Sequence, residues 1–126
     1  MNKTISTEKA PAALGPYSQA IVSGGMVYCS GQIPIDPATG TIHAETIEEQ
    51  TRQAISNLAN VLEAAGTSLA NVVKTTVFIS DMNDFAALNA VYTELFGAAK
   101  PVRSCVQVTR LPKDVKVEIE AIASLA

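Results

Sequence analysis

The chain has 126 residues, of which 48% are hydrophobic and 17% charged, and its net charge is −3. This size and composition predict one globular domain, residues 1–126, and exclude a disordered chain. The acidic balance, the absence of Trp and the lack of a Lys/Arg cluster argue against nucleic-acid binding. Because no apolar run is long enough to span a membrane and no signal-peptide pattern opens the chain, we expect no membrane partner, a cytoplasmic location and reduced thiols.

The first third of the chain reads as short strands and turns. Thr4 and Ile5 fit a short edge strand, and a loop shaped by Pro11, Gly15 and Pro16 leads into Tyr17. The Tyr17 ring either packs over this loop or lines a pocket. Two β-prone runs, 20–23 and 26–30, flank a Gly-Gly pair and predict a hairpin. Ser30 and Gly31 end the second run, where Gly31 indicates either a β-bulge or a place where a ligand approaches the backbone.

The histidine and cysteine residues do not favour a metal site or a catalytic triad. His43 is the only histidine and lies in a polar connection, so we expect it on the surface. The two cysteines, Cys29 and Cys105, are far apart and match no metal spacing. The sequence therefore predicts neither a metal site nor a histidine-based triad.

Two helices follow. Thr46 and Glu49 have the spacing of a capping box, and Gly66 supplies a stop, which predicts a helix over 46–65. A β-branched run, residues 72–79, predicts a strand with Val73, Val77 and Ile79 on its buried face. A second helix, from the caps near 80–84 to about Phe96, carries Asn89 within its apolar stripe, so this side chain needs a polar partner.

The last part of the chain alternates between apolar and polar side chains over 103–109 and 116–123, joined by a turn at Pro112 and Asp114. We predict an antiparallel pair of strands there. Val106 and Val108 would then face the core with Val117. Arg103, Cys105 and Glu118 would share the opposite face, either as a rigid platform for a small anion or as a solvated polar surface with cross-strand charge pairs.

The order of elements predicts a two-layer α+β domain, with a mixed sheet and both helices on one face. Right-handed strand–helix–strand crossovers place helices on a common face. The other face would stay uncovered by its own chain, and such a face is a plausible oligomer interface.

Four segments carry a resemblance to a known family: A-P-A-A-L-G-P-Y-S-Q (10–19), S-G-Q-I-P (30–34), V-V-K-T-T-V-F-I-S-D-M-N-D-F (72–85) and P-V-R-S-C-V-Q-V-T-R-L-P-K-D-V-K-V-E-I-E-A-I-A (101–123). With these motifs the chain closely resembles the RidA/YjgF family of enamine/imine deaminases. The resemblance implies a chorismate-mutase-like (YjgF-like) fold, a homotrimer with sites between subunits, and no cofactor. It implies 2-iminobutanoate/2-iminopropanoate deaminase activity: hydrolysis of intermediates such as 2-aminoacrylate, released by pyridoxal-phosphate enzymes acting on serine and threonine, to 2-keto acids and ammonia.

The resemblance also implies roles for individual residues. Arg103 would bind the substrate carboxylate, Glu118 would position or polarise the attacking water, and Cys105 would contribute mainly its backbone. The remaining positions that match the pocket lining of the family are Tyr17, Ser30, Gly31 and Asn89. The same pocket would also suit a non-catalytic sensor of 2-keto acids or amino acids. A ribonuclease or translation-inhibitor activity, reported for some relatives, is disfavoured by the acidic balance.

Overall fold

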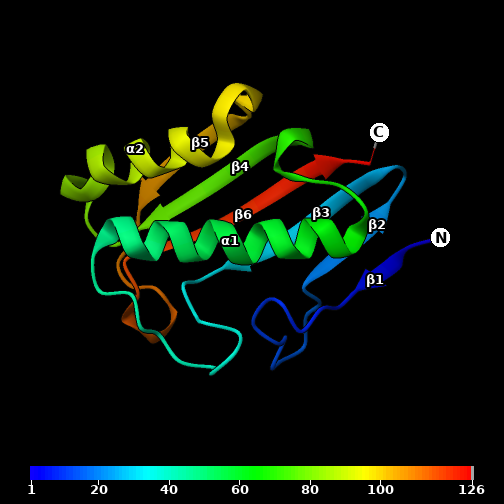
Figure 1. Cartoon of the computed structure of the whole chain (residues 1–126), viewed down its shortest axis with the longest axis horizontal. Coiled ribbons are helices and arrows are strands. Elements are labelled where there is room, and N and C mark those ends of the chain that lie inside the picture. Colours follow the sequence, from blue (N-terminus) through cyan, green and yellow to red (C-terminus); the bar gives the residue numbers. More distant parts are fainter. Residues whose placement is uncertain (126) are drawn as a thin grey trace.

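The computed structural model describes residues 1–125 as a single six-stranded sheet covered on one face by two α-helices (Figure 1). The strands lie in the order β1-β2-β3-β6-β4-β5, and β4 and β5 form the parallel pair of an otherwise antiparallel sheet. The predicted two-layer α+β architecture with a mixed sheet is confirmed. The elements are β1 (Lys3–Ile5), β2 (Ala20–Ser23), β3 (Met26–Gln32), α1 (Ile47–Ala65), β4 (Val72–Ile79), α2 (Phe85–Phe96), β5 (Val102–Gln107) and β6 (Val117–Ser124).

The predicted hairpin joins β2 and β3. Gly24 and Gly25 have φ angles of 58° and 77°. Residues other than glycine rarely adopt such positive φ angles, and a two-residue hairpin turn requires them. Further along β3, the pairing with β6 shifts register between Cys29 and Gln32. This irregularity surrounds Gly31 and confirms the predicted bulge.

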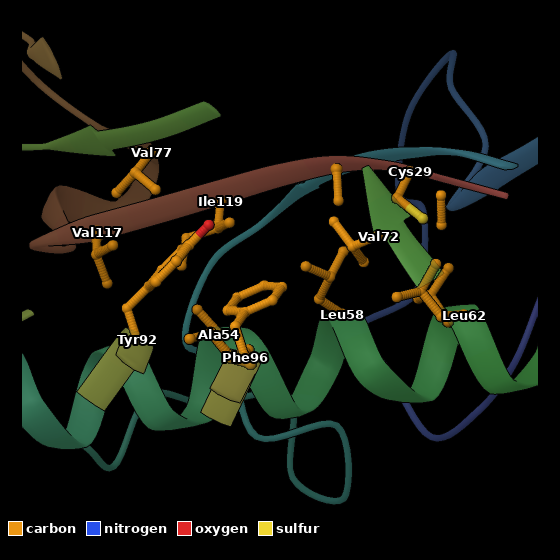
Figure 2. Close-up of a cluster of buried hydrophobic side chains, with 14 of the residues drawn as sticks. Cys29, Ala54, Leu58, Leu62, Val72, Val77, Tyr92, Phe96, Val117 and Ile119 are labelled. Atoms are coloured by element: carbon orange, nitrogen blue, oxygen red, sulfur yellow. The ribbon is translucent and has the colours of Figure 1, made fainter. Parts of the chain in front are cut away.

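Helix α1 begins and ends where the sequence predicts. Thr46 caps the first turn through a reciprocal pair of hydrogen bonds with Glu49, and Gly66 ends the helix with a φ of 92°. Figure 2 shows Leu58 and Leu62 pointing from α1 toward the sheet. Both are fully buried, as are Val77 of β4 and Ile119 of β6. Burial of each such side chain contributes about 1.5–3 kcal/mol, so this layer between helix and sheet holds the fold together.

The predicted pairing of segments 103–109 and 116–123 is wrong. Strand β4 lies between β5 and β6, pairing in parallel with β5 and antiparallel with β6. Alternation identified both strands, but it carries no information about which strand is the neighbour. The helix α2 crossover returns β5 to the far edge of β4, which leaves β6 to pair between β3 and β4.

The predicted face of β5 is also wrong. Arg103 pairs with Thr75 and Cys105 with Val77, and both partners are buried beneath the helices. Arg103 and Cys105 therefore lie on the helix side of the sheet, whereas Val106 lies on the other side and is 42% exposed. The arginine can occupy the helix side because its guanidinium packs against two aromatic rings of α2.

Strand β4 departs from its predicted pattern at one position. Val73 is 44% exposed rather than buried. The register with β6 shifts between Val72 and Lys74, so the alternation restarts there. Val77 and Ile79 are fully buried, as predicted.

The face of the sheet without helices carries both apolar and acidic side chains. One register row across it aligns Tyr28 with Ile122, and another aligns Glu118 with Phe78 and Val106. Tyr28 is 46% exposed. We call this surface the open face.

Candidate active site

A hollow of about 430 Å³ opens on the open face beside the β3 bulge. Its walls are Tyr17, Ser30, Gly31, Ile33, Pro112 and Glu118. Four of the predicted site residues therefore come together from three separate parts of the chain. Ile33 and Pro112 add apolar surface that the sequence did not indicate.

Glu118 is the acidic group of the hollow. It is partly buried, and desolvation raises its pKa above the ordinary value of 4.5, with a smaller contribution from the negative charge of Glu120. Its carboxyl group lies directly against the backbone of Gly31. A carboxylate held in this way is poised to accept a proton from a bound water.

The loop that carries Tyr17 is fixed from beneath by one buried amide. The side chain of Gln19 accepts a hydrogen bond from Thr7 N (2.7 Å) and donates to Thr7 O (3.0 Å) and Pro11 O (2.8 Å). Ser30 fastens the same loop to β3, since its Oγ donates to Ser18 O at 2.6 Å. Tyr17 is thus 55% exposed on an anchored loop, with its ring available to a ligand.

Buried amides of α1 hold the opposite walls. Asn57 donates to Ile33 O (3.0 Å) and Ile35 O (2.9 Å), and it is fully buried. Gln50 accepts a hydrogen bond from Lys116 N at 2.8 Å, two residues before Glu118. The helix therefore positions both the segment that carries Ile33 and the start of β6.

Arg103 forms a second cluster at the edge of the sheet. Its Nη1 donates to Asn89 Oδ1 at 2.7 Å, which provides the polar partner predicted for that asparagine. The guanidinium carbon lies 4.7 Å from the ring centre of Tyr92 and 5.4 Å from that of Phe85. Within residues 1–125 no carboxylate pairs with Arg103. Its Nε and Nη2 edge remains available for a carboxylate, which a guanidinium binds in a two-pronged geometry.

Cys105 lies two residues from Arg103 on the same side of β5. Partial burial raises the pKa of its thiol above 9.0, and the positive charge of Arg103 opposes this shift only in part. The thiol is therefore protonated near neutral pH and is a poor nucleophile.

The two clusters do not meet within one chain. Arg103 aligns with Thr75 of β4, whereas Glu118 aligns with Phe78, three residues further along. Side chains alternate between faces along a strand, so Arg103 and Glu118 lie on opposite faces of the sheet. The prediction that they share one face is wrong.

Phe85 and Tyr92 contact Arg103, although the sequence alone did not single them out. Their spacing offered a signal, because both lie on the same stripe of α2 as Asn89. A polar residue between two aromatic residues on one helix face is compatible with packing in the core and also with binding a planar cation. Only the position of Arg103 in the structure shows that these residues contact a cation.

His43 lies apart from both clusters. It is exposed, as predicted, and its Nε2 contacts the hydroxyl groups of Thr39 and Thr41 at 3.1 and 3.2 Å. Over the described residues no group of three or more His, Cys, Asp or Glu side chains is arranged to hold a metal ion. No helix within residues 1–125 is long and apolar enough to cross a membrane.

The chain is thus a small two-layer α+β domain with an arginine held by Asn89 and aromatic rings at a sheet edge and a half-buried glutamate on the open face. The chain belongs to the RidA/YjgF family: the family model described as "Endoribonuclease L-PSP" matches residues 7–125.

Relatives and solved structures agree with this membership. The 2-iminobutanoate/2-iminopropanoate deaminase of Salmonella typhimurium is 56% identical over 126 residues, and a RutC family protein of Pyrococcus horikoshii is 57% identical over 123; each alignment covers 98% of both chains. The crystal structure of Escherichia coli TdcF with bound serine has a TM-score of 0.93 at 50% identity, covering 98% of this chain and 99% of that one. Yeast Mmf1 has a TM-score of 0.96 at 41% identity, covering both chains completely. The predicted YjgF-like fold is confirmed.

Proposed function

We propose that this protein is an enamine/imine deaminase that hydrolyses 2-iminobutanoate and 2-iminopropanoate to 2-keto acids and ammonia. Arg103 carries the proposal, because it is held by Asn89 and aromatic rings but has no carboxylate partner within residues 1–125. An arginine so placed suits a small 2-imino acid. The deaminase name of relatives that are 54% and 56% identical supports the same reaction.

In the proposed reaction, Arg103 binds the substrate carboxylate and Glu118 accepts a proton from water as its oxygen attacks the imine carbon. Glu118 returns this proton to the nitrogen of the resulting carbinolamine. As ammonia leaves, the hydroxyl group of the carbinolamine loses its proton to the Glu118 carboxylate and becomes the carbonyl of the 2-keto acid, and that proton passes to solvent. An enamine such as 2-aminoacrylate enters after it gains a proton at carbon and becomes the imine. The backbone at Cys105 orients the water or the imine nitrogen. Imines hydrolyse unaided in water, so fixed positions and one base are sufficient for a modest acceleration.

The proposal includes a homotrimer with sites in the clefts between copies. Arg103 and Glu118 lie on opposite faces of the sheet in one chain, so a second copy is needed to bring one of each together. The open face offers exposed apolar side chains for such contact, including Tyr28, Val102 at 67% exposure and Val106. Sites built between copies would make oligomerisation a condition of activity. A cytoplasmic location, beside the pyridoxal-phosphate enzymes that release 2-aminoacrylate, completes the proposal.

The proposal is tested by generating 2-aminoacrylate in place with a serine dehydratase and following pyruvate release. The wild-type protein should accelerate release in proportion to its concentration, and Arg103→Ala should abolish the acceleration. No acceleration by the wild-type protein would exclude the proposed reaction.

A sensor of amino acids or 2-keto acids is the second candidate, because the related TdcF structure contains bound serine. Glu118→Gln distinguishes the two functions. A deaminase should lose turnover with this change, whereas a sensor should keep its ligand affinity and show no turnover even as wild type.

A further inference from the structure

Arg103 is a long side chain, and its guanidinium must be held in one orientation to bind a carboxylate through two hydrogen bonds. A guanidinium binds a carboxylate through two parallel N–H donors, so a small rotation of its plane removes one of the two hydrogen bonds. Asn89 holds one nitrogen, Nη1, at 2.7 Å. One hydrogen bond leaves rotation about that contact free. The planar groups that restrict this rotation are the rings beneath the guanidinium.

Tyr92 is the nearer of these rings. The guanidinium carbon is 4.7 Å from its centre, compared with 5.4 Å for Phe85. Tyr92 is itself enclosed, with 7% of its surface exposed, and its other side stacks on Phe96 with ring centres 4.3 Å apart. Figure 2 shows the ring rising from α2 with its hydroxyl oxygen directed toward the sheet.

The hydroxyl of Tyr92 has a defined partner in the sheet. It forms a hydrogen bond of 2.7 Å with Oγ1 of Thr75, which is fully buried. Thr75 is also the residue of β4 that aligns with Arg103 of β5. The same position of the sheet therefore determines both the backbone place of Arg103 and the depth of the ring beneath its head group.

We propose that Thr75 and Tyr92 are positioning residues that orient Arg103 toward the substrate carboxylate; this inference rests on the proposed function. Thr75 contacts no substrate, and it acts through the ring of Tyr92. A hydroxyl in this place has a purpose beyond filling space, because valine has the same shape as threonine but leaves the phenol of Tyr92 without its partner. The ring then moves toward another partner, and the guanidinium plane follows it.

The experiment compares Thr75→Val with Thr75→Ser, which keeps the hydroxyl. The measurements are KM and kcat in the dehydratase-coupled assay, and the dissociation constant of 2-oxobutanoate by calorimetry. Because carboxylate binding stabilises substrate and transition state alike, Thr75→Val should raise KM and the dissociation constant about 5- to 10-fold and change kcat less than about 2-fold. Thr75→Ser should stay within about 2-fold of wild type in all three.

Leu62→Ala is the control for loss of packing. Leu62 is fully buried beneath the sheet on α1, and Figure 2 shows it at the opposite end of the core cluster from Tyr92. This variant should lower the melting temperature without raising the dissociation constant. NMR of the Arg103 Nε–H group gives a readout that needs no ligand: its signal should broaden or shift in Thr75→Val and not in Thr75→Ser.

The outcomes separate this inference from the proposed function. If the wild-type protein released no pyruvate but still bound 2-oxobutanoate, the deaminase function would be excluded. The dissociation constants of Thr75→Val and Thr75→Ser would then still test whether Thr75 positions Arg103. Equal affinities and equal Arg103 signals in Thr75→Val and Thr75→Ser would overturn the inference even in a fully active enzyme.

Discussion

Gly31 and Glu118 occupy adjoining space, and the glutamate takes the volume that a side chain at Gly31 would need. A Cβ built on Gly31 would lie 2.9 Å from the carboxyl carbon of Glu118 and 3.0 Å from its Cγ, and closer still to Oε2. The φ of Gly31 is not in the left-handed region, so backbone strain does not require glycine here. A side chain at this position would instead have to displace the Glu118 carboxylate from the bulge.

Gly31→Ala should therefore displace Glu118 and lower kcat about 10-fold or more, since the proposed base loses its position. The coupled pyruvate assay measures this directly. Gly15→Ala is the control, because a Cβ there would meet Tyr17 only at 3.5 Å, an ordinary contact. Full activity of Gly31→Ala would show that the contact between these residues has no role in turnover.

The pH dependence of turnover should report Glu118. Burial, and secondarily Glu120, raise its pKa above 4.5. The proposed base acts as the carboxylate, so kcat should fall as the pH decreases through this raised pKa. Glu120→Gln removes the neighbouring negative charge and should move the acid limb to lower pH. Glu48→Gln, on the exposed side of α1, is the control and should leave the acid limb in place. If the acid limb lay at the same pH in Glu120→Gln and in Glu48→Gln, Glu118 would not be the group that titrates.

The stability of the fold should also depend on Glu118, but here the protonated form is the favourable one, whereas turnover needs the carboxylate. The folded protein holds the Glu118 proton more tightly than the unfolded chain does, because the folded-state pKa is raised. The resulting stabilisation is fully present below pH 4.5 and is lost as the pH rises through the raised pKa.

Glu118→Gln should therefore melt a few degrees higher than wild type at about pH 7.5 and show little difference at about pH 4. Thermal unfolding followed by circular dichroism checks this. A lower melting temperature for Glu118→Gln at the higher pH would mean that the carboxylate is stabilised where it lies.

Arg103→Lys should keep the positive charge and lose the planar fork. Hydrogen bonds to charged groups contribute about 1.5–3 kcal/mol, so the dissociation constant of 2-oxobutanoate should rise roughly 10- to 100-fold. Calorimetric titration gives the value. A lysine variant that binds as tightly as wild type would show that charge alone recognises the ligand.

Asn57→Ala should destabilise the fold, because it removes a fully buried amide and leaves the partly buried carbonyls of Ile33 and Ile35 without their donor. We expect the free energy of unfolding to fall by about 2–4 kcal/mol. Asn60→Ala, one turn along α1, removes a single exposed hydrogen bond to Lys9 O and should cost less than about 1 kcal/mol. Urea denaturation measures both, and equal losses would refute the distinction.

Local signals in the sequence predicted local structure well. Thr46 with Glu49 and Gly66 located α1, and the Gly-Gly pair located the first hairpin, because caps and turns depend on a few neighbouring residues. The surface position of His43 followed in the same way from its polar surroundings.

Long-range relations were harder to predict. Alternation identified β5 and β6, but the insertion of β4 between them depends on the path of the whole chain. The face of Arg103 could not be inferred from hydrophobicity, because β5 is an edge strand with Arg103 packed under α2 and Val106 on the open face. The family resemblance identified both Arg103 and Glu118 as site residues. Only their pairing with β4 in the structure shows that they lie on opposite faces of the sheet.

The most direct test of a shared site mixes two inactive variants. Arg103→Ala and Glu118→Gln are each expected to lack turnover, and equal amounts are unfolded together, refolded and assayed for pyruvate release. If neighbouring copies supply the two residues, random assembly should restore about one quarter of wild-type activity. A mixture as inactive as either variant alone, with wild-type protein regaining full activity after the same treatment, would contradict a site built from Arg103 of one copy and Glu118 of the next.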